Sequence, residues 1–139
     1  MNLLFKTPTN KEFEAVCLFI TQYELDSRNL QKQQFTIALR DNEMVGFGRL
    51  LEHSDCLELC SLGVMTTHRN QHIGKAIVEE LIKHSVKNIY LVCIIPDFFK
   101  PFGFIVVQRF PKSIQNKMDY CTRELVVPET YVAMVLDVI

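Results

Sequence analysis

Residues 68–78, His-Arg-Asn-Gln-His-Ile-Gly-Lys-Ala-Ile-Val, place charged, amide and imidazole side chains around one glycine. The residues before this segment have the composition of a strand, and the apolar residues after it recur with helical spacing. A loop that enters a helix in this way points unpaired main-chain N–H groups at one spot, where the positive end of the helix dipole adds to them. The arrangement predicts a binding site for an anion such as a pyrophosphate.

Several neighbouring residues could supply contacts to this anion. The candidate main-chain donors are Gln71, His72, Ile73, Gly74, Lys75 and Ala76. Arg69 and Lys75 add side-chain cations, and Gly74 lets a phosphate approach the backbone because it has no Cβ. A glycine here can also mark only a tight turn, and basic side chains near a helix start can be solvated. The dinucleotide-binding and Walker glycine patterns are both absent, so a different class of phosphate loop is expected.

Residues 56–104 resemble the GCN5-related N-acetyltransferases (GNAT family) in two motifs. In the first, a strand ends in an apolar-x-Val step, and R-G-x-G-x-G/A opens a helix about five residues later. The matching residues are Val64, Arg69, Ile73, Gly74 and Ala76, and His72 stands where a glycine is usual. A second register, Gln71-x-x-Gly74-x-Ala76, satisfies the looser form Q/R-x-x-G-x-G/A. The second motif is Phe-Phe-Lys-Pro-Phe-Gly-Phe at 98–104, which is similar to the Y-x-x-L-G-F of the family.

The resemblance implies a fold, a co-substrate and a set of binding residues. The fold would be the α/β (α+β) GNAT fold, with a mixed, mostly antiparallel sheet of six to seven strands, a central splayed parallel pair, and helices on both faces. Acetyl-CoA would be the co-substrate, and no metal is expected. The backbone of Leu62, Gly63 and Val64 would bind the pantetheine arm and polarise the thioester. The complete set of cofactor-binding residues implied is Leu62, Gly63, Val64, Arg69, Asn70, Gln71, His72, Ile73, Gly74, Lys75, Ala76 and Phe99.

The candidate catalytic residues follow from the same resemblance. Glu58 lies six residues before Val64, where several family members carry a glutamate that acts as general base. A carboxylate within an apolar strand is costly to bury without a partner, so either its pKa is raised for catalysis or it lies at an exposed position. The tyrosine that often protonates the leaving thiolate is replaced by Phe99. A water, Tyr90 or Tyr120 would then supply the proton, or the thiolate would leave directly.

The double phenylalanine at 98–99, followed by Cys121 and by Ala-Met at 133–134, is similar to the N-acetylglutamate synthase-like branch of the family. That branch implies a small, amino-acid-like amine as acceptor. No pairing of a nucleophilic Cys with a His is visible in the sequence, so direct transfer in a ternary complex is expected instead of a covalent acetyl-enzyme. Two alternatives stay open: a CoA-binding sensor or partner-binding module without catalysis, and an acetyltransferase for protein N-termini or lysines. Arg28, Arg40 and Arg49 could meet an acidic group of the acceptor or could be solvated at strand edges.

Hydrophobic periodicity places these residues on a β-α-β-β-β-α-β-α-β-α-β chain. Strands are expected at 3–5, 56–64, 88–95, 104–110 and 131–138, and residues 35–52 form two more that join at Asp41-Asn42. Helices are expected at 11–24 with Asn10 as N-cap, at 73–85, from Pro96 through 102, and at 111–120. Residues 25–34 are expected to form a loop, in which one helical turn is an option. The unit at 56–95 is expected to be a right-handed parallel crossover.

The composition limits the remaining functional classes. A length of 139 residues fits one domain, 1–139, and a formal net charge of −1 argues against nucleic acid or a membrane surface as partner. His53, Cys56 and Cys60 do not have zinc-ligand spacing, so no metal site is assigned. A cytoplasmic enzyme is expected from the absence of a signal peptide and from an odd number of cysteines, five in all. Whether the protein is a homodimer stays open.

Overall fold

The computed structural model describes residues 2–83 and 85–137. Its strands pair in the order β1-β2-β3-β4-β5-β7-β6, so the sheet has seven strands. The strands are β1 (Leu4–Lys6), β2 (Phe35–Arg40), β3 (Glu43–Glu52), β4 (Leu57–Val64), β5 (Ile89–Cys93), β6 (Ile105–Val107) and β7 (Val132–Leu136). The α-helices are α1 (Asn10–Gln22), α2 (Ile73–Lys83), α3 (Pro96–Phe99) and α4 (Lys112–Glu124), with 3-10 turns η1 (Lys32–Gln34), η2 (Thr66–His68) and η3 (Lys100–Phe102).

The chain forms two compact units. The first comprises the described residues up to Leu50 and those from Ser61 to Lys83, and the second comprises Leu51–Cys60 and the described residues from Ser85 onward. The expected mixed sheet with one parallel pair is confirmed, because β4 and β5 run parallel while the other registered pairs are antiparallel. In the part of the chain that the structure describes, no helix is long and apolar enough to cross a membrane.

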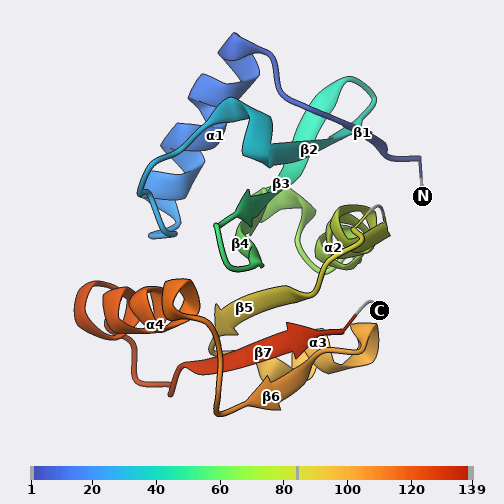
Figure 1. Cartoon of the computed structure of the whole chain (residues 1–139). Helices are drawn as coiled ribbons and strands as arrows, with labels where there is room; N and C mark the ends of the chain where they lie inside the picture. The colour runs from blue at the N-terminus through green and yellow to red at the C-terminus, as the bar shows by residue number, and fades with distance from the viewer. Residues whose placement is uncertain (1, 84, 138–139) are drawn as a thin grey trace. The chain divides into compact units, whose positions relative to one another are not determined.

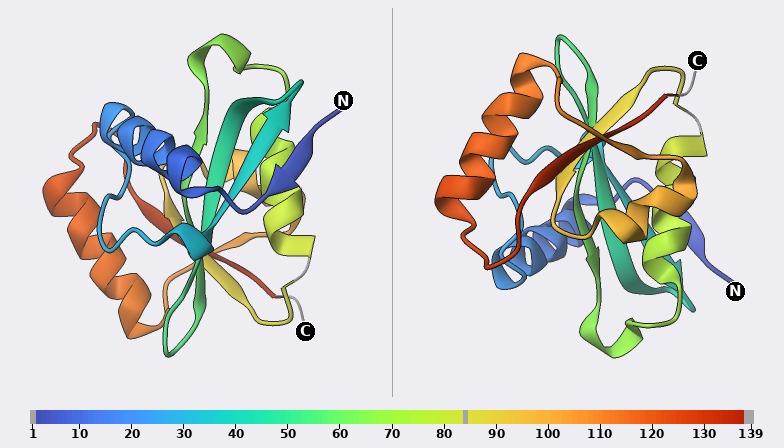
Figure 2. Two further views of the ribbon diagram at one scale, coloured as in Figure 1. Left: turned by 90° about the horizontal axis from the view of Figure 1, so that it is seen from above. Right: turned by 90° about the horizontal axis from the view of Figure 1, so that it is seen from below.

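In the first unit, α1 and α2 cover opposite faces of the strands (Figures 1 and 2). The alternation of side chains along β3 requires this arrangement, because successive strand residues point to opposite faces. Phe47 packs into the core cluster that contains Val16 and Ile20 of α1. On the other face, a Cβ at Gly48 would meet side chains of α2, so α2 approaches the sheet closely where β3 has no side chain.

The β2–β3 hairpin turns at Asp41-Asn42, as the sequence predicts. Both residues have positive φ values, 51° and 65°, and Arg40 pairs with Glu43 across them. Two consecutive left-handed residues are typical of the tight turn that matches the twist of antiparallel strands, and Asx residues tolerate this conformation.

The N-cap of α1 is Thr9, not Asn10. The Thr9 hydroxyl accepts a hydrogen bond from the amide of Glu12 at 3.2 Å, and the Glu12 carboxylate accepts one from the amide of Thr9 at 2.8 Å. This reciprocal capping box satisfies two amides at the helix start. Lys6 at the end of β1 binds the same carboxylate at 2.8 Å, which fixes the approach to the helix.

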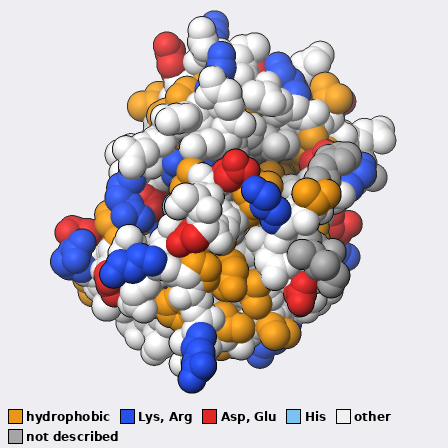
Figure 3. Space-filling model, viewed as in Figure 1, with side chains coloured by type: hydrophobic (Ala, Val, Ile, Leu, Met, Phe, Trp, Pro, Cys, Tyr) orange, Lys and Arg blue, Asp and Glu red, His pale blue; other side chains and the backbone are white. Residues whose placement is uncertain are grey.

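In the second unit, α4 and the α3–η3 turn lie on opposite sides of β5, β7 and β6 (Figure 2). Ile114 and Cys121 of α4 are buried, and so are Phe99 of α3 and Phe104 beside β6. The short strand β6 is the last of the pairing order, with Ile105 62% exposed. Hydrophobic side chains gather on the surface over β6 and β7 (Figure 3).

Several predicted element boundaries are wrong. The strand expected at 104–110 is only three residues long, and β5 alternates between buried and half-buried residues instead of being covered throughout. The helix expected at 73–85 ends at Lys83, Ser85 is not helical, and residue 84 lies outside the described residues, as does the end of the strand expected at 131–138. Helix α4 extends to Glu124, beyond the expected end at residue 120.

Candidate active site

The segment between β4 and α2 turns sharply just before the helix, within the first unit. Asn70 and His72 have φ values of 66° and 63°, in the left-handed region. Asparagine and histidine visit this region more readily than most residues other than glycine, although at some cost in free energy. These are the two positions at which the motif register that starts at Arg69 would carry glycines, so the backbone has the turn that glycines usually provide.

Among the residues that the structure describes, the main-chain amides of this turn have no hydrogen-bond partner. Ala76 is the first residue whose amide bonds within the helix, to the carbonyl of His72 at 3.1 Å. No group among the described residues accepts a hydrogen bond from the amides of residues 70–75. The turn therefore offers several N–H donors, with the positive end of an 11-residue helix behind them.

Arg69 is held against the first unit on two sides. Its Nε donates to the carbonyl of Val64 at 3.1 Å, and its guanidinium lies over the ring of Tyr23, 4.9 Å from the centroid. Tyr23 is the C-cap of α1, so the start of this loop is anchored to that helix. The side chain thus braces the loop, and the terminal nitrogens of its guanidinium carry no hydrogen bond within the described residues.

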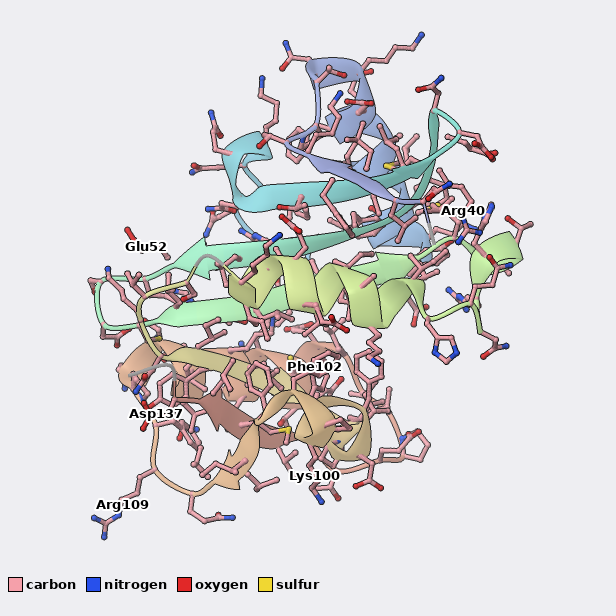
Figure 4. The ribbon with its side chains drawn as sticks, turned by 90° about the vertical axis from the view of Figure 1, so that its right-hand side faces the viewer. Arg40, Glu52, Lys100, Phe102, Arg109 and Asp137 are labelled. Carbon is pink, nitrogen blue, oxygen red and sulfur yellow. The ribbon has the colours of Figure 1, made fainter. Side chains whose placement is uncertain are left out.

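A second arginine reaches the loop from β2. Arg40 donates from its terminal nitrogen to the side-chain oxygen of Gln71 at 2.6 Å, and it lies beside the loop that leads to α2 (Figure 4). The side chains of His72 and Lys75 are exposed at the same turn. The loop therefore carries positive charge although the whole chain is nearly neutral.

Strand β4 changes conformation in the stretch that the sequence assigns to the pantetheine arm. Its parallel ladder with β5 contains only the pairs Leu57↔Ile89 and Glu58↔Tyr90, although β4 continues to Val64. The left-handed residue in the strand is Ser61, with φ 49°, and not Gly63. Gly63 is needed for another reason, because a Cβ there would lie 2.5 Å from the ring of Phe47.

Glu58 is buried in the second unit, with only 2% of its surface exposed, so the alternative of an exposed edge position is wrong. One carboxylate oxygen lies 2.8 Å from Nε2 of His53, and the other lies 3.0 Å from Nζ of Lys117. Lys117 belongs to α4 and is itself 5% exposed. A buried carboxylate thus meets a cation and an imidazole, the compensation that burial of a charge demands.

Neither partner of Glu58 is predicted from the sequence, in which His53 is only a possible metal ligand and Lys117 has no assigned role. The spacing of apolar residues in α4 could have identified Lys117, because Ile114, Lys117 and Cys121 share its buried face. In the part of the chain that the structure describes, no three His, Cys, Asp or Glu side chains converge on a point that could hold a metal.

The candidate proton donors lie in the second unit. Phe99 is 5% exposed and packs edge-on against Phe98 and Phe104, with centroids 4.9 and 5.8 Å apart. Within this unit it is a core residue, which offers no proton. Tyr90 is opposite Glu58 in the β4–β5 ladder, and Tyr120 lies on α4; both are half-buried.

The model of the acetyltransferase (GNAT) family matches residues 4–104, which is most of the chain and includes the loop and strand β4. The chain belongs to the GNAT family of acetyltransferases. Members of this family are acetyltransferases that use acetyl-CoA as co-substrate.

Solved structures share the fold of this GNAT chain at low identity. N-acetylglutamate synthase from Neisseria gonorrhoeae, complexed with coenzyme A and N-acetyl-glutamate, has a TM-score of 0.79 and 12% identity over 100% of this chain and 36% of its own. Rv2747 from Mycobacterium tuberculosis, in complex with CoA and NLQ, has a TM-score of 0.75 and 16% identity; the match covers 98% of this chain and 99% of Rv2747. Arabidopsis thaliana Naa50, with the bisubstrate analogue CoA-Ac-MVNAL, has a TM-score of 0.65 and 16% identity; the match covers 97% of this chain and 98% of Naa50.

The GNAT chain spans about a third of the length of the N-acetylglutamate synthase chains that it matches, 36% and 33% in two structures. Rv2747 and Naa50, in contrast, are matched over almost their whole length. The fold is therefore shared both with proteins of similar size and with one part of a larger enzyme.

Proposed function

We propose that the protein transfers the acetyl group of acetyl-CoA to the primary amine of a small, amino-acid-like molecule, directly within a ternary complex. The reaction converts an ammonium and a thioester into an amide, a thiol and one released proton. The protein must bind the coenzyme, take a proton from the amine and stabilise the charge that develops on the carbonyl oxygen.

The observation that carries this proposal is the group of uncapped amides at residues 70–75. Coenzyme A carries a pyrophosphate, and a helix start with several unpaired N–H donors is a suitable receptor for it. Arg40, which reaches this loop from β2, and Lys75 in the first turn of α2 would add charge-assisted contacts. Because Arg69 is tied to Val64 and Tyr23, we assign it a role in holding the loop as well as in attracting the phosphates.

Glu58 is the proposed general base, acting on the amine directly or through a water. Its burial restricts access by bulk solvent, and His53 orients one of its oxygens. Lys117 lies in ion-pair contact with the other oxygen, which accepts no hydrogen bond among the described residues. Leu62, Gly63 and Val64, farther along the same strand, would provide backbone groups to the pantetheine arm and the thioester carbonyl. Phe99 cannot protonate the leaving thiolate, so we assign that proton to a water, Tyr90 or Tyr120.

A small amine is favoured by the likeness to N-acetylglutamate synthase and to Rv2747 over the full length of this chain. The likeness to Naa50 supports a second candidate, the acetylation of protein N-termini. The buried position of Phe99 supports a third, a CoA-binding sensor, because the usual acid is replaced by a core residue.

Thiol release from acetyl-CoA, measured with the twenty amino acids and with peptides of varied N-terminus, separates these candidates. We expect turnover with one or a few amino acids. Turnover only with peptides would assign the protein to N-terminal acetylation, and tight acetyl-CoA binding without turnover on any amine would assign it to the sensor class.

Calorimetry with two variants of Gly74 tests the location of the coenzyme. G74E adds bulk and negative charge at the proposed phosphate site and should abolish binding of acetyl-CoA. G74A is the matched control, because alanine is at least as stable as glycine in the first turn of a helix and adds no charge; it should retain most of the affinity. Normal binding by G74E would place the coenzyme elsewhere.

A further inference from the structure

The buried environment of Glu58 joins three elements of the second unit. His53 belongs to the turn after β3, Glu58 to β4, and Lys117 to α4. His53 contacts one oxygen of the carboxylate at 2.8 Å, and Lys117 lies in ion-pair contact with the other at 3.0 Å, although that second oxygen accepts no hydrogen bond among the described residues. Both partners are groups that can carry positive charge. This trio is called the Glu58 cluster below.

A buried ion pair is poor evidence for a purely stabilising role. Two charges lose their hydration when they are buried, and a well-packed apolar pair of similar size is often at least as stable. The Glu58 cluster therefore suggests a use for an oriented carboxylate. In a protein that must take a proton from an amine, that use is the base itself.

The members of the Glu58 cluster differ in their access to solvent. The side chain of His53 is 23% exposed, whereas those of Glu58 and Lys117 are 3% and 6% exposed. Histidine is also the side chain whose charge ordinarily changes between pH 5 and 8. His53 is therefore the member of the Glu58 cluster that solvent reaches most readily.

We propose that Lys117 and His53 are positioning residues for the base: Lys117 holds Glu58 as an oriented carboxylate, and His53 sets with pH how readily that carboxylate accepts a proton from the acceptor amine. This inference rests on the proposed function. With neutral His53, the charges of Glu58 and Lys117 cancel. With protonated His53, the cluster carries one net positive charge, and the second cation stabilises the carboxylate and weakens it as a base. The rate should fall as the pH falls.

Other titratable groups near the cluster do not provide this switch. Burial, and then the neighbouring Asp55, raise the pKa of Cys56 to about 12, so this thiol stays neutral. Asp55 binds the amide of Ser113, and hydrogen bonding to Ser113 lowers the pKa of its carboxyl, so it stays charged. Burial raises the pKa of Tyr131, which faces Lys117 from the segment before β7. Tyr90 lies opposite Glu58 on β5.

Nuclear magnetic resonance of the side-chain carboxyl carbons tests the inference without an acceptor. The Glu58 signal is assigned by its loss in E58Q and followed from pH 5 to 8. In the wild type, the chemical shift of Glu58 should change in a titration step whose midpoint equals the midpoint measured for the ring resonances of His53. H53Q keeps a neutral hydrogen-bond donor and should lose this step, whereas H68Q, a histidine change in the exposed turn η2, should keep it. The inference is overturned if the chemical shift of Glu58 in the wild type does not change as His53 titrates, or if the titration step is still present in H53Q.

The rate of thiol release, measured with the acceptor that the amino-acid panel identifies, adds the catalytic readout. H53Q removes the second cation, which would otherwise weaken the base at low pH, so it should raise the ratio of kcat at pH 6 to kcat at pH 8 several-fold, by on the order of the effect of one opposite charge in contact with a carboxylate. The KM for acetyl-CoA should stay unchanged.

K117R should restore most of the kcat that K117M loses, because it keeps the cation; equal losses in the two variants contradict the role of Lys117. Absence of turnover in the wild type overturns the proposed function, whereas an unchanged H53Q profile in an active enzyme overturns this inference alone.

Discussion

Replacement of Gly63 by alanine places a methyl group against the ring of Phe47. An alanine Cβ would lie 2.5, 2.9 and 3.1 Å from three ring atoms, well inside normal contact. The ring is fully buried and packs against Phe35, with centroids 6.4 Å apart, so it has little room to move. Overpacking of this kind costs about 1–3 kcal/mol, and we expect G63A to lower the free energy of unfolding by that amount.

A double-mutant cycle with F47L isolates the contact. F47L alone should destabilise the protein by on the order of 1–3 kcal/mol, because it removes buried apolar volume. In G63A/F47L the smaller side chain makes room for the methyl group, so the loss should be smaller than the sum of the single losses by about 1 kcal/mol. Urea denaturation followed by circular dichroism measures each free energy.

G48A is the matched control on the opposite face of β3. Its Cβ would meet Leu81 and Ile77 of α2 at 2.7 and 2.9 Å, but the nearest atom, Cδ1 of Leu81, is the end of a flexible side chain. Its cost should be smaller than that of G63A and should not change in the F47L background. If G63A and F47L add within about 0.3–0.5 kcal/mol, the steric explanation for Gly63 is wrong.

Three further substitutions or treatments have defined outcomes. H72G should raise the free energy of unfolding by up to about 1 kcal/mol in urea denaturation, because it relieves a left-handed residue at φ 63°; a loss of stability contradicts the conformational argument. The Glu12 pKa is lowered, first by the hydrogen bond from Lys6 and then by the Thr9 amide, so its contribution is present at neutral pH and is lost as pH falls through the folded-state pKa. E12Q should therefore lower stability at pH 7 and leave it less sensitive to acid between pH 5 and 3, and an unchanged slope contradicts the capping-box assignment. The pKa of Cys56 is raised to about 12, so iodoacetamide at pH 8 should alkylate this thiol far more slowly than it alkylates the thiol of glutathione. Mass spectrometry of timed samples measures both rates, and equal rates would contradict a protonated Cys56.

The elements that periodicity defines were predictable from sequence. The buried stripe of α2 (Ile73, Ile77, Leu81) and the hairpin turn at Asp41-Asn42 depend on neighbours in the chain, and both are found as expected. The N-cap was misplaced by one residue because Thr9 and Asn10 are both good capping residues. The distinction depends on Glu12, three residues after Thr9, whose carboxylate returns to the Thr9 amide.

Long-range pairing explains what sequence could not predict. Glu58 and Lys117 are far apart in the chain, and their contact depends on how α4 packs within the second unit. Arg49 is another example. The sequence is compatible with a solvated side chain at this position of β3, yet Arg49 is only 1% exposed. Its guanidinium donates to Gln34 and to the carbonyls of Arg28 and Asn29, so it fixes the loop before β2.

The loop that precedes α2 was predicted in character but not in conformation. The sequence indicated a polar turn with free amides, and the described residues contain no cap for them. The left-handed conformations of Asn70 and His72 could not be derived from spacing, since neither residue is glycine. The bracing of Arg69 by Tyr23 also required the position of α1.

Amide resonances in ¹H–¹⁵N spectra give the most direct test of the coenzyme site. Coenzyme A should shift the amide protons of residues 70–75 downfield, because each gains a charged hydrogen-bond acceptor, whereas pantetheine, which lacks the pyrophosphate, should leave them in place. Coenzyme A that binds while these amides keep their positions would contradict the account of how this protein holds its co-substrate.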